Sequence, residues 1–180
     1  MFYNSEEMER RAVLDAAARV CAAARTAPKA RGIDNIHTAV LTDADKDAVA
    51  ETMERMGNAT GADFFLRDAG NVRSAQALVL IGIEEGQRGL GEICGYCHFK
   101  DCADCREHGG VCVYDPIDVG IALGSAAATA ADCRMDSRIL FSAGRAAQSL
   151  GLMGENVTLI YGLPLAVTGK SPFFDRKKKA

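Results

Sequence analysis

The sequence lacks the features of a nucleic-acid-binding or membrane protein. Its 180 residues carry a formal net charge of -3 and include only seven Phe and four Tyr, with no Trp. A protein that neutralises phosphate backbones needs an excess of Lys and Arg, so we expect no nucleic-acid partner. The longest apolar stretch, Val119 to Ala131, lies between Asp118 and Asp132 and is shorter than the roughly 20 residues that cross a bilayer. We therefore expect no membrane partner.

Signals for secretion and for hydrolysis are also missing. Residues 1–7 have neither the basic start nor the apolar stretch of a secretory signal, so we expect a cytoplasmic protein. The sequence has no serine nucleophile elbow, phosphate loop, HExxH sequence or pair of catalytic carboxylates. Their absence argues against hydrolase and kinase chemistry.

What the sequence does have is a group of closely spaced cysteines. Five of its seven cysteines fall between residues 94 and 112, interspersed with glycine. Thiolates this close repel one another unless a cation shares their charge, and zinc and iron are metals that thiolates prefer. A reducing cytoplasm disfavours disulfides, and the odd number of cysteines would leave one thiol unpaired. We therefore expect a metal or iron–sulfur site here.

The spacing of these cysteines bears on which metal they bind. Only four residues separate Cys97 from Cys102, whereas ribbon-type zinc sites commonly place about ten to twenty residues between their two pairs. In a [4Fe–4S] site, three closely spaced cysteines and a more distant fourth hold the cubane, and glycines let the backbone approach its sulfides. The spacing favours the cluster, with a structural zinc site and a disulfide framework as the alternatives.

Four cluster ligands must come from these five cysteines. The closely spaced set is Cys94, Cys97 and Cys102. The fourth is either Cys105, which is near in sequence, or Cys112, which follows the turn at Gly109 and Gly110. We favour Cys112, because such a turn brings the chain back over the cluster. His98 and His108 flank the cysteines, but four thiolates suffice.

Hydrophobic periodicity predicts alternating helices and strands around the cysteines. Asn4 and Glu7 form a capping box ahead of a helix over residues 5–25. The apolar run Ala77–Ile83 is typical of a strand buried on both faces, so we expect it at the centre of the sheet. The other predicted elements are strands at Ile36–Thr42, Phe64–Leu66 and Val157–Tyr161, and helices at 43–57, 118–133 and 137–150. This alternation predicts one α/β, or layered α+β, domain over residues 1–180, into which the Cys-rich segment 84–115 is inserted.

Further stretches carry a resemblance to a known family. They are Asp118-Val-Gly-Ile-Ala-Leu-Gly-Ser-Ala, Arg134-Met-Asp-Ser-Arg138 and Gly169-Lys-Ser-Pro-Phe-Phe-Asp-Arg176. With the Cys-Gly-x-Cys-x4-Cys spacing, they resemble the ferredoxin-domain proteins of bacteria and archaea over nearly the whole chain. The resemblance implies a [4Fe–4S] cluster and leaves Cys105 as an extra thiol. The ligands that it implies are Cys94, Cys97, Cys102 and Cys112.

A second, more distant resemblance concerns the scaffold. Ala23-Ala-Arg-Thr-Ala-Pro28 after the first helix, a strand–helix unit, and Gly162-Leu-Pro164 near the end follow the order seen in FMN-dependent nitroreductases. This implies a nitroreductase-like sheet packed by helices, a homodimer, and a bound FMN. The sequence departs from that family at Lys29–Ile33, which replaces an Asn-x-Gln-Pro-Trp segment. The cations expected near the flavin phosphate are Arg25, Lys29, Lys170 and Arg176.

These expectations combine into a cytoplasmic [4Fe–4S] redox protein. Its electrons would pass to a partner protein, to a flavin or to a small-molecule substrate. The sequence does not distinguish an electron carrier from an oxidoreductase, although the chain is larger than a bare ferredoxin needs and so favours a second site. The alternative is a zinc-stabilised interaction module without catalytic activity.

Overall fold

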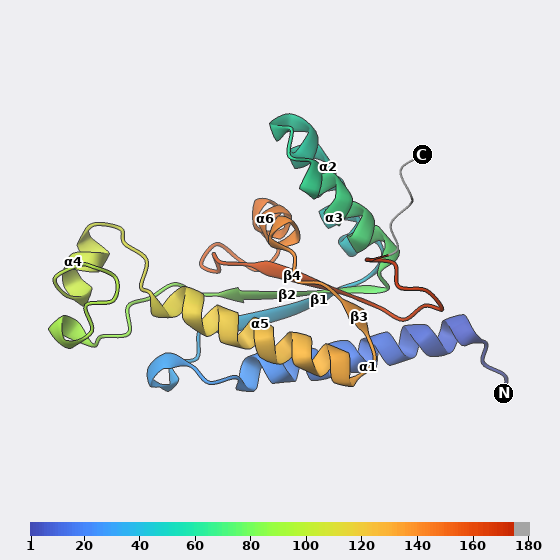
Figure 1. Cartoon of the computed structure of the whole chain (residues 1–180), viewed down its shortest axis with the longest axis horizontal. Helices are drawn as coiled ribbons and strands as arrows, with labels where there is room; N and C mark the ends of the chain where they lie inside the picture. Colours follow the sequence, from blue (N-terminus) through green and yellow to red (C-terminus); the bar gives the residue numbers. More distant parts are fainter. Residues whose placement is uncertain (175–180) are drawn as a thin grey trace.

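A four-stranded antiparallel sheet forms the centre of the protein, with helices on both faces (Figure 1). The computed structural model describes residues 1–174 of the chain. The spatial order of the strands is β1 (Ile36–Leu41), β2 (Ala77–Ile83), β4 (Tyr161–Ala166) and β3 (Asp136–Ser137), and each neighbouring pair is antiparallel. The predicted layered fold, with its sheet packed by helices, is confirmed.

Strand β2 is the centre of this sheet, as its continuous apolar sequence predicts. All seven of its residues are buried, and it pairs with β1 on one side and with β4 on the other. Side chains alternate along a strand, so β2 contributes to two cores. Val79 and Ile81 belong to the core on one face, and Leu78 and Leu80 to the core on the other.

Helices α1 (Ser5–Thr26) and α5 (Tyr114–Asp132) cover one face of the sheet. The predicted capping box starts α1, since the Asn4 side chain accepts from the Glu7 N–H at 2.9 Å and Glu7 accepts from the Asn4 N–H at 2.9 Å. Small residues line α5 where it packs on α1, and Ser125 Oγ donates to Ala23 O at 2.9 Å. This pair of helices directs the start of α5 toward the Cys-rich segment.

Three helices cover the opposite face: α2 (Asp43–Thr60), α3 (Asp63–Ser74) and α6 (Phe141–Ser149). Helix α6 lies very close to the chain that leads into β4. A Cβ atom added to Gly144 would lie 1.7 Å from the Ile160 carbonyl oxygen, so only glycine fits there. Ser142 in the first turn of α6 donates to buried Asp68 of α3 at 2.7 Å, which ties two helices of this layer together.

Several element boundaries differ from the sequence-based expectation. The segment expected as a strand at Phe64–Leu66 lies inside α3, because its buried positions recur at the helical spacing. The last strand is Tyr161–Ala166 and not Val157–Tyr161: pairing with β2 overrides the turn tendency of Gly162 and Pro164. Helix α2 continues past Gly57 and ends at Thr60, before the left-handed Gly61.

Helices α5 and α6 also begin at residues other than those predicted. Helix α5 begins four residues before the predicted position, at Tyr114, so it includes the end of the expected insert 84–115. Helix α6 begins at Phe141 instead of Ser137, because Asp136–Ser137 forms β3. Within residues 1–174, none of the helices combines the length and apolar character needed to cross a membrane.

The chain between β2 and α5 forms a lobe that projects from one end of the layered scaffold (left in Figure 1). Its regular structure is limited to a single 3-10 turn, Gly91–Ile93, and the six-residue helix α4 (Cys102–Glu107). We call residues 84–113 the insert. All five clustered cysteines belong to it.

Candidate metal centre

The five cysteines of the insert surround one cavity. Its wall also includes Leu90, Phe99, Val113 and Tyr114. The cysteines in the wall are Cys94, Cys97, Cys102, Cys105 and Cys112. The structure thus brings together all four predicted ligands and the extra thiol, and none of them forms a disulfide.

The insert has almost no apolar core of its own. Between Gly89 and Val111, the only buried residue is Cys105, with 1 % of its surface exposed. Large apolar side chains point outward instead: Ile93 is 88 % and Tyr96 65 % exposed. A segment that buries so little apolar surface cannot offset the conformational entropy that it loses on folding. Something other than side-chain packing must hold it in place.

Local backbone features set the position of each thiol. Cys94 follows the 3-10 turn, and Cys97 lies in the loop between Gly95 and His98, both of which adopt positive φ angles. Cys102 and Cys105 stand three residues apart on α4, so they share one face of that helix. Asp101 caps α4 by accepting from the N–H groups of Ala103 and Asp104, each at 2.9 Å. Cys112 lies just before the start of α5.

Cys105 is the innermost thiol of the group. Its Sγ donates to Gly110 O at 3.3 Å. Burial, followed by the neighbouring thiol of Cys97, raises the pKa of Cys105. At the cavity wall, desolvation and the nearby Cys94 raise the pKa of Tyr114. Both shifts oppose the addition of further negative charge at the cavity, as expected where several thiols crowd together without a cation.

A single metal ion and a cluster require different arrangements of thiols. Among residues 1–174, no three His, Cys, Asp or Glu side chains converge on a position where they would hold one metal ion. A mononuclear zinc site requires four donors about 2.0–2.3 Å from one point. A [4Fe–4S] cubane binds each thiolate at a different corner, so its ligands surround a volume. In this chain, five thiols line one cavity.

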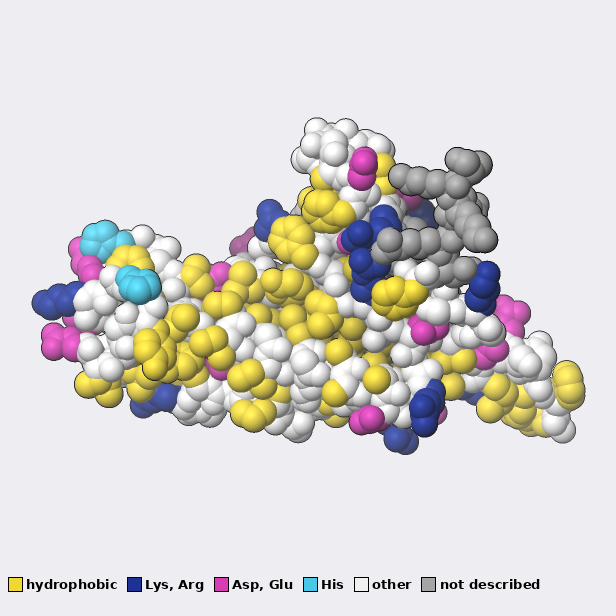
Figure 2. Space-filling view, viewed as in Figure 1, with side chains coloured by type: hydrophobic (Ala, Val, Ile, Leu, Met, Phe, Trp, Pro, Cys, Tyr) yellow, Lys and Arg dark blue, Asp and Glu magenta, His cyan; other side chains and the backbone are white. Residues whose placement is uncertain are grey.

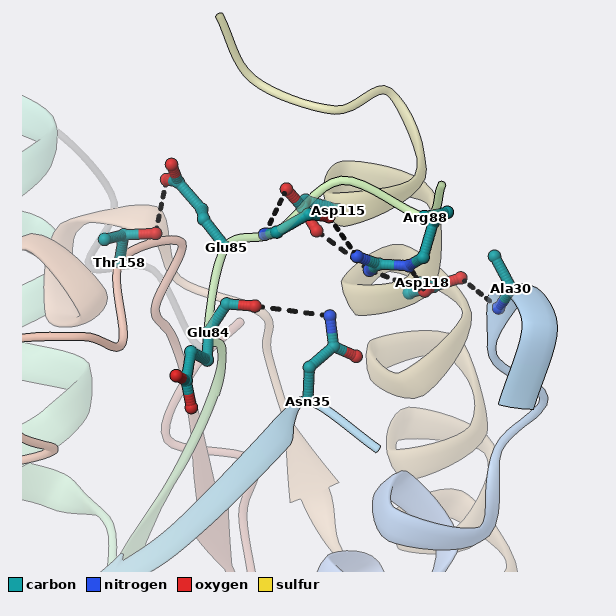
Figure 3. A network of polar contacts seen from close by, with 9 residues as sticks. Ala30, Asn35, Glu84, Glu85, Arg88, Asp115, Asp118 and Thr158 are labelled. Atoms are coloured by element: carbon teal, nitrogen blue, oxygen red, sulfur yellow. Dashed lines mark hydrogen bonds and ion pairs between the residues drawn. The ribbon is translucent and has the colours of Figure 1, made fainter. Parts of the chain in front are cut away.

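A buried ion network fastens the insert to the scaffold (Figure 3). Arg88, 2 % exposed, extends from the first part of the insert toward two carboxylates of α5. Its Nη2 lies 2.9 Å from Asp118 Oδ2 and 2.8 Å from Asp115 Oδ1. The second contact is an ion pair without hydrogen-bond alignment, since Asp115 Oδ1 accepts no hydrogen bond. The Arg88 guanidinium is therefore shared by two buried carboxylates, those of Asp115 and Asp118.

The same network reaches a third part of the chain, the 3-10 turn Ala30–Gly32. The Ala30 N–H donates to Asp118 Oδ1 at 3.0 Å, and Arg31 donates to the Arg88 carbonyl oxygen at 2.7 Å. Asp115 Oδ2 also accepts from the Gly86 N–H at 3.2 Å. The sequence does not predict this network. It marks Asp118 as the boundary of an apolar stretch, the start of a helix and part of a family resemblance, and no sequence pattern links residue 88 to residues 115 and 118.

The cations expected around a flavin phosphate are not gathered in one place. Arg25 pairs with Asp34 at 2.6 Å, and the Lys29 amine donates to the Arg25 carbonyl oxygen at 2.5 Å, so these two are neighbours with partners inside the chain. Lys170 lies in the segment after β4, which Figure 1 shows toward the opposite end of α1. Arg176 lies outside the described residues. In a single chain, the structure therefore places Arg25 and Lys29 together and Lys170 apart from them, and the phosphate site stays a prediction.

The histidines of the insert stay outside the cavity. His98 and His108 are exposed, and Figure 2 shows the histidine side chains of this lobe on its outer surface (cyan). His108 Nδ1 lies 3.0 Å from Asp104 Oδ1. Neither histidine lines the cavity, so the thiols remain the candidate ligands.

Comparison with solved structures relates the scaffold to flavoproteins. A putative NADH dehydrogenase/NAD(P)H nitroreductase from Bacteroides thetaiotaomicron matches 91 % of this chain and 80 % of its own, with a TM-score of 0.57 and 12 % identity. A putative nitroreductase in complex with FMN from Desulfovibrio desulfuricans has a TM-score of 0.57 and 14 % identity. The match covers 91 % of this chain and 79 % of the nitroreductase chain. At such low identities, these matches establish the nitroreductase-like fold alone.

Sequence comparison adds the family. The profile described as "Uncharacterized protein containing a ferredoxin domain (DUF2148)" matches residues 108–176. A protein of Archaeoglobus fulgidus, described as "Uncharacterized protein", is 37 % identical over 187 aligned residues, which cover 99 % of this chain and all of the relative. A ferredoxin domain supports a redox role. The chain belongs to this family of ferredoxin-domain proteins.

Proposed function

We propose that this chain is a [4Fe–4S] protein that transfers single electrons. The cluster ligands in this proposal are Cys94, Cys97, Cys102 and Cys112. The observation that carries it is a lobe without a core, whose single buried residue between Gly89 and Val111 is a cysteine and whose cavity is lined by five thiols. A metal cluster supplies the bonds that this lobe lacks.

The bound cluster supplies one-electron chemistry, and the protein sets the conditions for it. Gly91 and Gly95 lie in the cavity wall, where glycine lets backbone N–H groups approach sulfur closely. Hydrogen bonds to sulfur and limited access of water are the main means by which a protein tunes the reduction potential of a cluster. Leu90, Phe99 and Val113 provide the apolar part of the wall that limits water.

The surface of the insert supports docking of a redox partner. Ile93, Tyr96 and Val111 expose 88 %, 65 % and 47 % of their surfaces, and all belong to the lobe that holds the cavity. Exposed apolar groups beside a redox centre allow a partner protein, or a small-molecule electron acceptor, to approach closely. We place this exchange in the cytoplasm, a proposal supported by seven free cysteines.

The scaffold supports a second redox group. One structural neighbour was solved in complex with FMN. We extend the proposal to a flavin bound between two copies of this chain, because Lys170 lies apart from Arg25 and Lys29 within one copy. Figure 2 shows hydrophobic side chains gathered along α5, where Ile117 and Ile121 are 41 % and 42 % exposed, and a homodimer would cover such a surface. This extension rests on the fold and is separate from the cluster proposal.

Metal and sulfide analysis tests the proposal directly. Protein purified without oxygen is expected to be brown, to bleach with a strong reductant, and to contain about four iron and four acid-labile sulfide per chain. One zinc per chain without sulfide would contradict the proposal and favour a zinc-stabilised interaction module. A yellow supernatant after heat denaturation would support the flavin, and a colourless one at full iron content would remove it.

A further inference from the structure

Two pairs of aromatic rings connect the wall of the cavity with the surface of the insert. Tyr114 in the wall lies against Tyr96, with 6.3 Å between the ring centroids. Phe99, also in the wall, stacks on His108 with 6.2 Å between the centroids. Tyr96 and His108 are both exposed. Each pair therefore has one ring that lines the cavity and one ring that a partner could touch.

The surroundings of the two outer rings differ. His108 Nδ1 lies 3.0 Å from Asp104 Oδ1, so this ring already has a polar partner within the chain. Tyr96 follows the exposed Ile93 by three residues, and three residues span at most about 11 Å. An aromatic ring with a hydroxyl group, beside an exposed aliphatic side chain, is the kind of group that anchors protein interfaces. Tyr96 is therefore the better anchor for a partner.

The negative charge of the chain is concentrated in the insert. Residues 84–113 contain six Asp and Glu and three Lys and Arg, so their formal charge of -3 equals that of the whole chain. One of these three cations, Arg88, is buried in the ion network with α5 and adds little positive charge to the surface. Glu92 is exposed and directly precedes Ile93. A surface of this charge attracts a basic partner and repels an acidic one.

We propose that Ile93 and Tyr96 form the docking surface for a one-electron carrier protein with a basic surface. This inference rests on the proposed cluster function, because it names the partner of the same redox centre. Contact with Tyr96 brings the partner against a ring that touches the cavity wall, and the surrounding carboxylates orient its approach. One electron leaves this protein and enters the oxidised centre of the partner, and no bond or proton changes place. A second copy of this chain would carry the same negative charge, so it is disfavoured here.

Zero-length cross-linking tests the docking surface without a measurement of electron transfer. The probe is mitochondrial cytochrome c, a basic protein that accepts one electron. It is mixed in its oxidised form with the oxidised full-length protein at an ionic strength of about 10 mM, where the Debye length is about 30 Å. A water-soluble carbodiimide then joins carboxylates of one protein to lysine amines of the other, and trypsin digests the product.

The sequence makes the position of the cross-link easy to assign. Cleavage after Arg88 and Lys100 releases peptide 89–100, in which Glu92 is the single carboxylate side chain. We expect this peptide to be coupled to a lysine of cytochrome c. Cross-links confined to carboxylates outside the insert, or none, would overturn the inference. Coupling of peptide 89–100 to a second copy of this chain instead would also overturn it.

Rates of electron transfer test the role of Tyr96. Protein reduced with dithionite is mixed with cytochrome c in a stopped-flow instrument without oxygen. Y96A is expected to lower the second-order rate constant at least about fivefold, the loss that truncation of an interface anchor typically causes, with unchanged iron content and reduction potential. Y96F keeps the ring and should retain the wild-type rate. H108A is the matched control, because it removes the exposed ring of the other pair. Equal losses in Y96A and H108A, or a wild-type rate in Y96A, would overturn the inference.

The sign of the charge is tested on both proteins. E92K is expected to lower the rate constant about threefold or more at low ionic strength, and the difference should vanish at about 1 M salt. D132K makes the same change of charge at an exposed residue at the opposite end of α5 and should leave the rate unchanged. Succinylated cytochrome c, whose lysines carry carboxylates, should react more slowly than the native form. Equal rates for the two forms would overturn the basic partner.

Iron and sulfide analysis of the same preparation separates this inference from the proposed function. If wild-type protein contains no iron or sulfide, even after reconstitution, the cluster proposal fails and this inference falls with it. If the protein carries a full cluster while Glu92 stays free of cross-links and Y96A reduces cytochrome c as fast as wild type, only the inference fails.

Discussion

Gly110 shows how closely a single residue controls the cavity. A Cβ atom added there would lie 2.4 Å from Phe99 Cε2 and 3.0 Å from Cys105 Sγ, so the chain passes directly over both side chains. Phe99 and Cys105 both line the cavity, and Cys105 also donates to the Gly110 carbonyl oxygen. The absence of a side chain at this position therefore fixes the depth of the innermost thiol.

Replacement of Gly110 by alanine is expected to destabilise the loaded protein. The added methyl group must displace Phe99 or Cys105, and such overpacking costs about 1–3 kcal/mol. Urea denaturation under anaerobic conditions measures this loss in the free energy of unfolding. Gly70→Ala is the control: Gly70 lies inside α3, its added Cβ meets no atom within 4 Å, and a gain of about 0.5–1 kcal/mol is expected. An unchanged free energy of unfolding for Gly110→Ala would contradict the tight packing of Gly110 against Phe99 and Cys105.

Cys112 and Cys133 provide a matched pair of thiols beside α5. Cys112 lies just before the helix and lines the cavity. Cys133 follows the last residue of the helix and is not among the residues that line the cavity. We expect Cys112→Ala to lose most of its iron and sulfide, because a cubane with three thiolates has one open corner. Cys133→Ala should keep both. Iron and sulfide analysis of the anaerobically purified variants measures the difference, and full loading of Cys112→Ala would exclude this cysteine as a necessary ligand.

At the scale of elements, Arg88 joins three pieces of chain that are distant in sequence. It pairs with Asp115 and Asp118 in the first turns of α5, and its carbonyl oxygen accepts from Arg31 in the 3-10 turn after α1. Removal of one partner from a buried ion group leaves charges without compensation in a poorly solvated place. The network is therefore a fastening point at the base of the insert.

Substitution of Arg88 by methionine is expected to lower the free energy of unfolding by about 3–5 kcal/mol, because two buried carboxylates lose their cation. Chemical denaturation measures the loss, and restoration of part of it by additional D115N and D118N changes would identify the uncompensated charges as its cause. Arg106→Met is the control. Arg106 is exposed on the same lobe, and its side chain donates to Gln87 at 3.0 Å, so a change within about 0.5 kcal/mol is expected. Equal effects of the two substitutions would show that the network does not stabilise the protein.

The elements also show what local sequence encodes. Helix α1 and strand β2 are predicted closely, since a capping box and a continuous apolar run are local signals. Strand β4 is displaced in the prediction because its pairing with β2 is set by residues about 80 positions away in the chain. The cysteine spacing likewise reveals the cavity, whereas the partners of Arg88 are brought together only by the tertiary fold. Local patterns found the thiols, and the network that holds them in place depends on contacts that no short motif contains.

At the scale of the whole molecule, the protein combines two parts with different sources of stability. The scaffold has two hydrophobic cores, one on each face of the sheet, and both include residues of β2. The insert projects from one end of it and has one buried residue between Gly89 and Val111. Regions with few buried apolar contacts open at low free-energy cost, independently of a well-packed core. The two parts should therefore respond differently to the loss of a cofactor.

Removal of iron is expected to loosen the insert while the sheet stays folded. Amide hydrogen exchange after anaerobic chelation should show faster exchange in residues 89–111, because in the proposed function metal–thiolate bonds take the place of the missing core there. Amides of β2 and β4 should exchange as slowly as in the loaded protein, since their hydrogen bonds and both cores do not involve the cavity. A loss of protection throughout the sheet would show that the cluster stabilises the whole fold. Unchanged exchange in the insert would mean that the lobe is held without metal, and would remove the main support for a cluster.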